Sequence, residues 1–268
     1  MADIALELAK LEAQRSVKKK PIDLSNLSKK KRVVTWDCET VPALAHVYQL
    51  KTRFIPHSAI VEPGGIIGWS WKWLDEDEVH WLDIRDGYPQ MIQKMRDVLD
   101  EADIAVGQNS VRFDLARARG HCARLGIPPF SNPKHVDLLN TSKAMGFESA
   151  SLDYMCRMMG VTRKVDNGGA NNWIGAISGD EEAWERLETY GKGDITATEE
   201  LFLALLPWLR NVNLSSAPGN CPRCDSPETV EAGLHWAVNT TYPRRKCTNC
   251  GGYFRTTVGG TSSRTSAV

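Results

Sequence analysis

The stretch Val33-Val34-Thr35-Trp36-Asp37-Cys38-Glu39-Thr40 decides how the rest of the chain is interpreted. Its first residues are β-branched or aromatic and follow a polar segment, a pattern typical of a buried strand. Alternate side chains of a strand share a face, so we expect Asp37 and Glu39 to point the same way at the strand's end. Two carboxylates that close repel each other unless a cation neutralises them. A solvated strand end is the alternative explanation of this pair.

Downstream of this strand, the hydrophobic pattern predicts further strands and helices. Strands are predicted at 65–74, 79–84, 103–107 and 134–139, and helices at 88–101, 113–125, about 151–159 and 181–209. A hairpin followed by alternating units predicts an α/β fold, a mixed sheet with helices on both faces. Glycines and asparagines at 168–172 predict an irregular loop before the last helix.

Two other motifs carry carboxylates. Asp114 ends the motif Asn109-Ser-Val-Arg-Phe-Asp114, between a predicted strand and a predicted helix, where open α/β sheets place their sites. An aspartate in a first helical turn also suits helix capping, so this residue alone decides nothing. Tyr190 and Asp194 are four residues apart on a predicted helix and share a face. Simple core packing of the tyrosine, with a solvated Asp194, is the alternative.

The ordered combination of the three motifs resembles that of DEDD exonucleases. More narrowly, residues 32–210 are similar to the tyrosine-bearing (DEDDy) branch of the DnaQ-like family, within the ribonuclease H-like superfamily. The sister branch carries histidine five residues before the last aspartate, and Thr189 stands there in this chain. The resemblance implies a five-stranded ribonuclease H-like sheet. It also implies 3′→5′ release of nucleoside 5′-monophosphates from a single-stranded end, with DNA favoured over RNA.

The resemblance also implies roles for single residues. Asp37, Glu39, Asp114 and Asp194 would hold two Mg²⁺ or Mn²⁺ ions, since carboxylates suit hard cations. Asp37 would bridge both ions, and Tyr190 would orient the attacking water.

Four further residues are substrate-binding candidates. Thr40 and Asn109 would contact the terminal nucleotide, by analogy with their motif positions. Arg163 and Lys164 would contact phosphates, although a solvated loop explains them as well.

Four of the seven cysteines form two Cys-x2-Cys pairs: Cys221, Cys224, Cys247 and Cys250. Four thiolates at this spacing predict a structural Zn²⁺ site of the zinc-ribbon kind. A redox role is the alternative, and the duplicated pair argues against it. Aromatic residues alternate with arginine and lysine around the second pair, which suits single-stranded nucleic acid, with a protein-docking surface as the alternative.

Charge and composition define the remaining expectations. The chain has 268 residues and no net charge, but residues 1–36 carry +5, residues 207–268 carry +4 and the centre carries −9. Basic ends would help an acidic core to hold a polyanion, unless they are merely solvated. We expect a basic extension (1–31), an exonuclease domain (32–210), a zinc ribbon (217–256) and a disordered tail (257–268).

The cellular setting is also an expectation. The sequence shows no membrane span or secretory signal, so we expect a cytoplasmic protein of a bacterium or a phage-infected cell. It would be similar to small phage exonucleases, and we expect a replication protein or polymerase as a partner. The alternatives are an exoribonuclease and a non-catalytic binding protein that acts through its ribbon.

Overall fold

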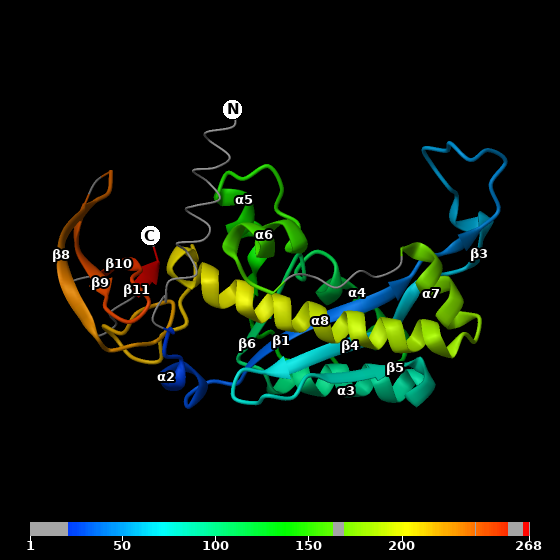
Figure 1. Ribbon diagram of the computed structural model, residues 1–268, viewed down its shortest axis with the longest axis horizontal. Helices are drawn as coiled ribbons and strands as arrows, with labels where there is room; N and C mark the ends of the chain where they lie inside the picture. The colour runs from blue at the N-terminus through cyan, green and yellow to red at the C-terminus, as the bar shows by residue number, and fades with distance from the viewer. Residues whose placement is uncertain (1–20, 163–168, 239, 257–264, 268) are drawn as a thin grey trace. The chain divides into compact units, whose positions relative to one another are not determined.

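The computed structural model describes residues 21–162, 169–238, 240–256 and 265–267. The chain, whose helices and strands are drawn in Figure 1, divides into two compact units. The sheet unit comprises residues 33–137 and 164–196, and the cysteine unit comprises residues 1–32, 138–163 and 197–268. None of the described helices is long and apolar enough to span a membrane.

A five-stranded mixed sheet forms the centre of the sheet unit. Its strands lie in the order β5-β4-β1-β6-β7. Their bounds are β1 Val33–Val41, β4 Gly65–Trp73, β5 His80–Asp83, β6 Ile104–Gly107 and β7 Lys134–Asp137. The first three strands of that order pair antiparallel, whereas β1, β6 and β7 pair parallel. The central position of β1 explains why its apolar side chains are buried on both faces.

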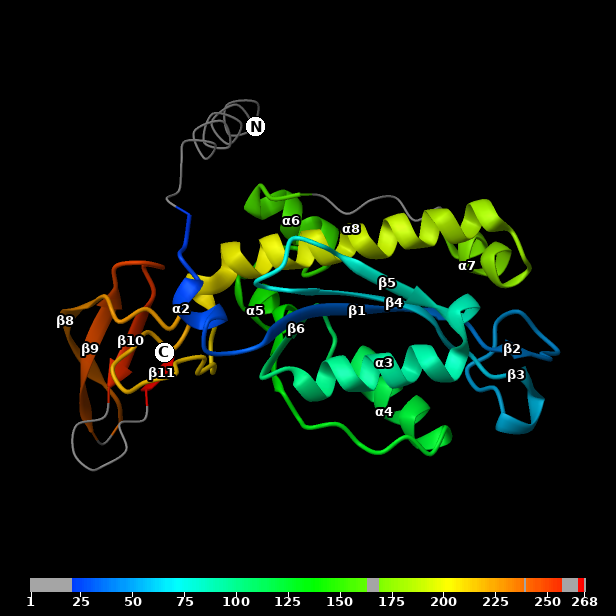
Figure 2. The same cartoon turned by 90° about the horizontal axis from the view of Figure 1, so that it is seen from below.

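Helices cover both faces of this sheet (Figure 2). On one face, α3 (Tyr88–Glu101) and α4 (Asp114–Arg124) pack on a core that contains Trp36, Trp69 and Met95. On the other face, Trp184 and Leu187 of α8 (Glu181–Leu205) pack on Ile67 of β4 together with α7 (Ala170–Ile177). The predicted fold class, an α/β fold whose mixed five-stranded sheet has helices on both faces, is confirmed.

Gly191 allows α8 to lie close to the sheet. A Cβ atom at this position would be 2.6 Å from the Trp81 ring and 2.7 Å from Ser70 Oγ. The helix runs through Gly191 without a break, so the residue serves close packing on β4 and β5. This packing fixes the height of the following helical turn above the sheet.

The structure adds several elements that the sequence pattern did not indicate. They are a two-stranded arm of β2 (Leu44–Ala45) and β3 (Ile60–Glu62), the helices α2 (Ser25–Ser28), α5 (Leu138–Ala144) and α7, and three short 3-10 turns at His57–Ala59, Ile84–Asp86 and Leu206–Trp208. The loop predicted at 168–172 is wrong for Asn171 and Asn172, which belong to the first turn of α7. Gly169, with a φ of 73°, precedes this helix, so the turn-forming signal marks its start.

The cysteine unit contains a second sheet of order β11-β10-β9-β8. Its strands are β8 Thr229–Trp236, β9 Thr241–Cys247, β10 Tyr253–Thr256 and β11 Thr265–Ala267, and this unit also contains α6 (Leu152–Met159). We predicted a disordered tail over 257–268, whereas Thr265–Ala267 pair with the edge of β10. Residues 257–264 and 268 lie outside the described part of the chain.

Residues 21–32, which precede β1, pack on the cysteine unit. The sequence had predicted an exposed basic extension over 1–31. Leu27 is fully buried. The Asp23 backbone exchanges two hydrogen bonds with the Asn249 side chain, at 3.0 and 2.7 Å. Lys31 donates to the carbonyl oxygens of Leu214 and Ser215. Residues 1–20 lie outside the described residues.

Candidate active site and four-cysteine cluster

The second half of β1 carries the first two carboxylates. Glu39 is 6% exposed and Asp37 is half-buried. The two residues are separated by one position on the central strand, so their side chains project from the same face of the sheet. A β-bulge between Glu39 and Thr40 interrupts the pairing with β4 beyond this pair. The carboxylates therefore lie where regular pairing of the central strand is interrupted.

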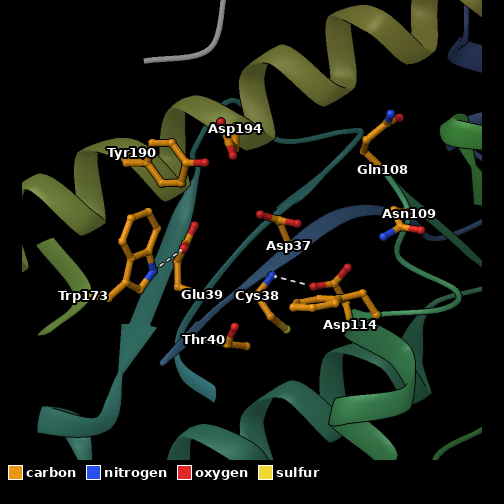
Figure 3. Close-up of a pocket in the computed structure, with 11 residues that line it drawn as sticks. Asp37, Cys38, Glu39, Thr40, Gln108, Asn109, Asp114, Trp173, Tyr190 and Asp194 are labelled. Carbon is orange, nitrogen blue, oxygen red and sulfur yellow. Dashed lines mark hydrogen bonds between the residues drawn. The ribbon is translucent and has the colours of Figure 1, made fainter. Parts of the chain in front are cut away.

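Helix α8 brings the third carboxylate to the same place. Asp194 is 2% exposed. One of its carboxylate oxygens lies within 4.8 Å of one carboxylate oxygen of Asp37 and one of Glu39. Tyr190, one helical turn earlier and 5% exposed, lines the same pocket (Figure 3). Residues separated by more than 150 positions thus meet in one pocket of about 240 Å³.

Asp114 lines this pocket but is held differently. It lies at the start of α4 and accepts a hydrogen bond of 3.2 Å from the Cys38 backbone N–H (Figure 3). Burial raises the pKa of its carboxyl group to about 7. Asp37, Glu39 and Asp194 form the acidic cluster of this pocket, and Asp114 lies outside it. The structure therefore brings three of the four predicted ligands together and places the fourth beside them.

Trp173 is a pocket residue that the sequence interpretation did not include. Its indole Nε1–H donates a 2.9 Å hydrogen bond to Glu39 Oε2 (Figure 3). Its ring meets the Tyr190 ring edge-on, with centroids 5.8 Å apart. Trp173 therefore orients Glu39 and packs on Tyr190. The asparagine-rich start of α7 was the only sequence signal near it, and we interpreted that signal as a loop.

The predicted substrate-binding residues have different outcomes. Thr40 and Asn109 line the pocket together with Gln108. Asn109 adopts a positive φ of 61°, and its backbone N–H donates to Asp137 Oδ1 at 2.8 Å. That hydrogen bond holds the strand-to-helix turn against β7. Arg163 and Lys164 lie outside the described residues.

The pocket suits a divalent cation by the chemistry of its donors. Carboxylate oxygens are the ligands that Mg²⁺ and Mn²⁺ prefer. Three carboxylates whose oxygens approach within 4.8 Å repel one another strongly in a buried pocket, and a cation between them removes that repulsion. Burial and the neighbouring carboxylates Asp114, Asp37 and Glu39 also raise the pKa of the Cys38 thiol well above its usual range. Cys38 therefore stays neutral and adds no charge to the pocket.

The four cysteines of the two Cys-x2-Cys pairs meet in the cysteine unit. All four are at least 93% buried, and their sulfur atoms lie within 4.8 Å of one another. The Sγ atoms of Cys221 and Cys250 are 3.7 Å apart, and those of Cys224 and Cys247 are 3.6 Å apart. Tetrahedral Zn²⁺ with Zn–S bonds of about 2.3 Å requires sulfur–sulfur distances of about 3.8 Å. The cluster therefore fits one tetrahedral metal ion.

Polar groups around the cluster complement its charge. The Gly252 backbone N–H donates to Cys250 Sγ at 3.4 Å, and Asn249 Nδ2 donates to Cys224 Sγ at 3.6 Å. The guanidinium of Arg223, which is 2% exposed, donates to the Leu209 and Tyr253 carbonyl oxygens. Four thiolates around Zn²⁺ carry a net charge of −2, which a buried guanidinium partly offsets.

Comparisons with known proteins give no match by sequence and a structural similarity over part of the chain. No protein-family model and no curated protein matches the sequence. Among solved structures, the family B DNA polymerase of the archaeon Pyrobaculum calidifontis is similar over 66% of this chain, with 18% identity and a TM-score of 0.49. Trypanosoma brucei RNase D is similar over 68%, with 16% identity and a TM-score of 0.43. The chain spans 25% of the polymerase and 60% of the RNase D length.

Proposed function

We propose that this chain is a metal-dependent 3′→5′ exonuclease that releases nucleoside 5′-monophosphates, with DNA preferred to RNA. One observation carries the proposal: Asp37, Glu39 and Asp194 converge in one pocket with their oxygens within 4.8 Å, beside Tyr190. The motif resemblance supplies the direction of digestion. The two similar structures are named as a DNA polymerase and an RNase D, and both names refer to nucleic acid as the substrate.

The acidic cluster would hold the catalytic cation, with Asp114 placed to help hold a second. Bound Mg²⁺ or Mn²⁺ would lower the pKa of the attacking water and offset the negative charge that develops at the phosphate. Trp173 holds Glu39 in one orientation through its hydrogen bond. Tyr190 directs its phenol into the same pocket, where it would position the water by a hydrogen bond (Figure 3).

The shape of the surface supports a polymeric substrate. The 240 Å³ pocket adjoins a larger hollow of about 670 Å³, and Thr40 and Trp173 line both. Arg117 and His121 of α4 line the larger hollow. A nucleic-acid strand whose end lies in the small pocket would therefore continue through the larger hollow. There its phosphates would meet the positive charge of Arg117.

The proposal also covers the branch of the family, the second metal site, the domain boundaries, the origin and the partner. We assign the chain to the DEDDy branch because of Tyr190, and we propose that the cysteine cluster would hold Zn²⁺ as a zinc ribbon. The boundaries at 32–210 and 217–256 describe these two parts. A phage origin and a polymerase partner extend the resemblance to small phage exonucleases.

The test is release of mononucleotides from linear DNA and RNA strands of one sequence, compared side by side. Metal is withheld by dialysis against magnesium-free buffer, because strong chelators would also remove structural zinc. We expect 5′-monophosphates only when Mg²⁺ or Mn²⁺ is restored, faster from DNA, with a circular single strand left intact. No release from either linear strand in both metals would contradict the proposal, and cutting of the circle would indicate an endonuclease.

A further inference from the structure

The outer face of the β8–β9–β10 sheet gathers cations and aromatic rings. Side chains alternate along β9 and β10, and Lys246 pairs with Tyr253 while Arg244 pairs with Arg255. Five residues therefore share one face, which we call the basic–aromatic face: Tyr242, Arg244, Lys246, Tyr253 and Arg255. They include three positive charges and no carboxylate.

The opposite face of these strands packs toward the four-cysteine cluster. Cys247 and Phe254 are fully buried on that face. Arg245 also lies there and bonds to the side chain and carbonyl oxygens of Thr229. The register thus separates the basic and aromatic residues that alternate in the sequence. Arg245 and Phe254 stabilise the β8–β10 module, and the five residues of the basic–aromatic face point outward.

Cations lie beside both rings of the basic–aromatic face. The cationic groups of Arg244 and Lys246 lie 5.7 and 5.5 Å from the centre of the Tyr253 ring. The guanidinium of Arg255 lies 4.8 Å from the centre of the Tyr242 ring. Tyr253 is nevertheless 47% exposed, and Arg244 and Lys246 are exposed as well. Both a ring surface and positive charge therefore remain available to a ligand.

Aromatic rings beside cations on an exposed sheet face match single-stranded nucleic acid. Bases stack on aromatic side chains, and phosphates pair with neighbouring arginine and lysine. An acidic protein segment would use the charges but would have no comparable use for the rings. We propose that the basic–aromatic face is a second nucleic-acid binding surface, which grips a single strand without reading its sequence. The proposal rests on the proposed function in taking nucleic acid as the substrate.

The experiment measures binding of a fluorescent 20-nucleotide single strand to the full chain, by anisotropy at several salt concentrations without added Mg²⁺. An Asp37→Asn background prevents digestion. Arg244→Gln, Lys246→Gln and Arg255→Gln are combined, and Tyr253→Leu is made separately. We expect the triple variant to bind at least about ten-fold more weakly at ~0.1 M salt, with a salt slope lower by about 2, since each phosphate contact contributes about 0.7. Tyr253→Leu should weaken binding by about ten-fold with the salt slope unchanged, because stacking releases no counterions.

The control combines Lys94→Gln, Lys143→Gln and Arg157→Gln, which removes the same charge from exposed positions outside the basic ends and outside the basic–aromatic face. Zinc content and circular dichroism show that each variant is folded. Equal affinity and salt slope in the two triple variants would overturn the proposal. A triple variant of the basic–aromatic face that loses binding to an acidic peptide, but still binds the single strand as before, would also overturn it. A chain that binds the strand through this face but releases no nucleotides in the digestion assay would contradict only the proposed function.

Discussion

Replacing Asp37 with asparagine should lower the rate of nucleotide release by about a thousandfold or more. The substitution keeps the shape of the side chain but removes a negative charge from the centre of the acidic cluster. Metal ions contribute several kcal/mol to transition-state stabilisation in such reactions, and a thousandfold corresponds to about 4 kcal/mol. Single-turnover release from a 3′-labelled strand in saturating Mg²⁺ measures the effect.

The fold of this variant should be unaffected. Asp37 is only half-buried, and removing one of three crowded like charges relieves repulsion in a chain without metal. Asp77→Asn is the matched control, because Asp77 is an exposed aspartate in the turn between β4 and β5. We expect that control to keep its full rate. Undiminished release by Asp37→Asn would eliminate the acidic cluster as the site of catalysis.

Replacing Cys247 with serine should abolish zinc binding and unfold the β8–β10 module. The exposed strands β8 and β9 bury little apolar surface, so we expect the module to depend on a metal bound by its four cysteines rather than on a hydrophobic core. Binding of structural Zn²⁺ contributes about 10–16 kcal/mol in small zinc domains, and that free energy is also folding free energy. We expect about one zinc per wild-type chain by mass spectrometry and almost none in the variant. Limited proteolysis should then cut within residues 229–256.

Cys156→Ser is the matched control for this prediction. Cys156 is a fully buried cysteine of the same unit, and its thiol donates to the Ala197 carbonyl oxygen at 3.7 Å, away from the four-cysteine cluster. Zinc content and protease resistance should remain those of the wild type. A Cys247→Ser chain that retains a full equivalent of zinc would show that the four cysteines are not the ligands.

The strands and helices of the sheet unit could be predicted because periodicity and burial agree there. Apolar runs such as Val33–Trp36 belong to a central strand, and Met91, Met95 and Val98 of α3 share a buried face. Strand alternation predicted that Asp37 and Glu39 share a face, and helical spacing predicted the same for Tyr190 and Asp194. That the two pairs meet was implied by the resemblance of the motifs to a known family, because local rules do not bring distant segments together.

The features that were missed depend on contacts between distant segments. Trp173 bonds to Glu39 across 134 positions, and Asn249 bonds to Asp23 across 226. No local pattern encodes either contact. The direction of Asp114 toward the Cys38 N–H depends on how α4 packs against β1. Likewise, the alternation of arginine and aromatic residues near Cys247 did not reveal which residues face outward, because that depends on strand register.

Manganese located by anomalous scattering tests most directly whether the acidic cluster is a metal site. Crystals of the full chain grown with Mn²⁺ should show an anomalous peak within bonding distance of the carboxylates of Asp37, Glu39 and Asp194, and crystals of Asp37→Asn should show a weaker one or none. Manganese bound elsewhere on the chain, with no peak between these three carboxylates, would contradict the account.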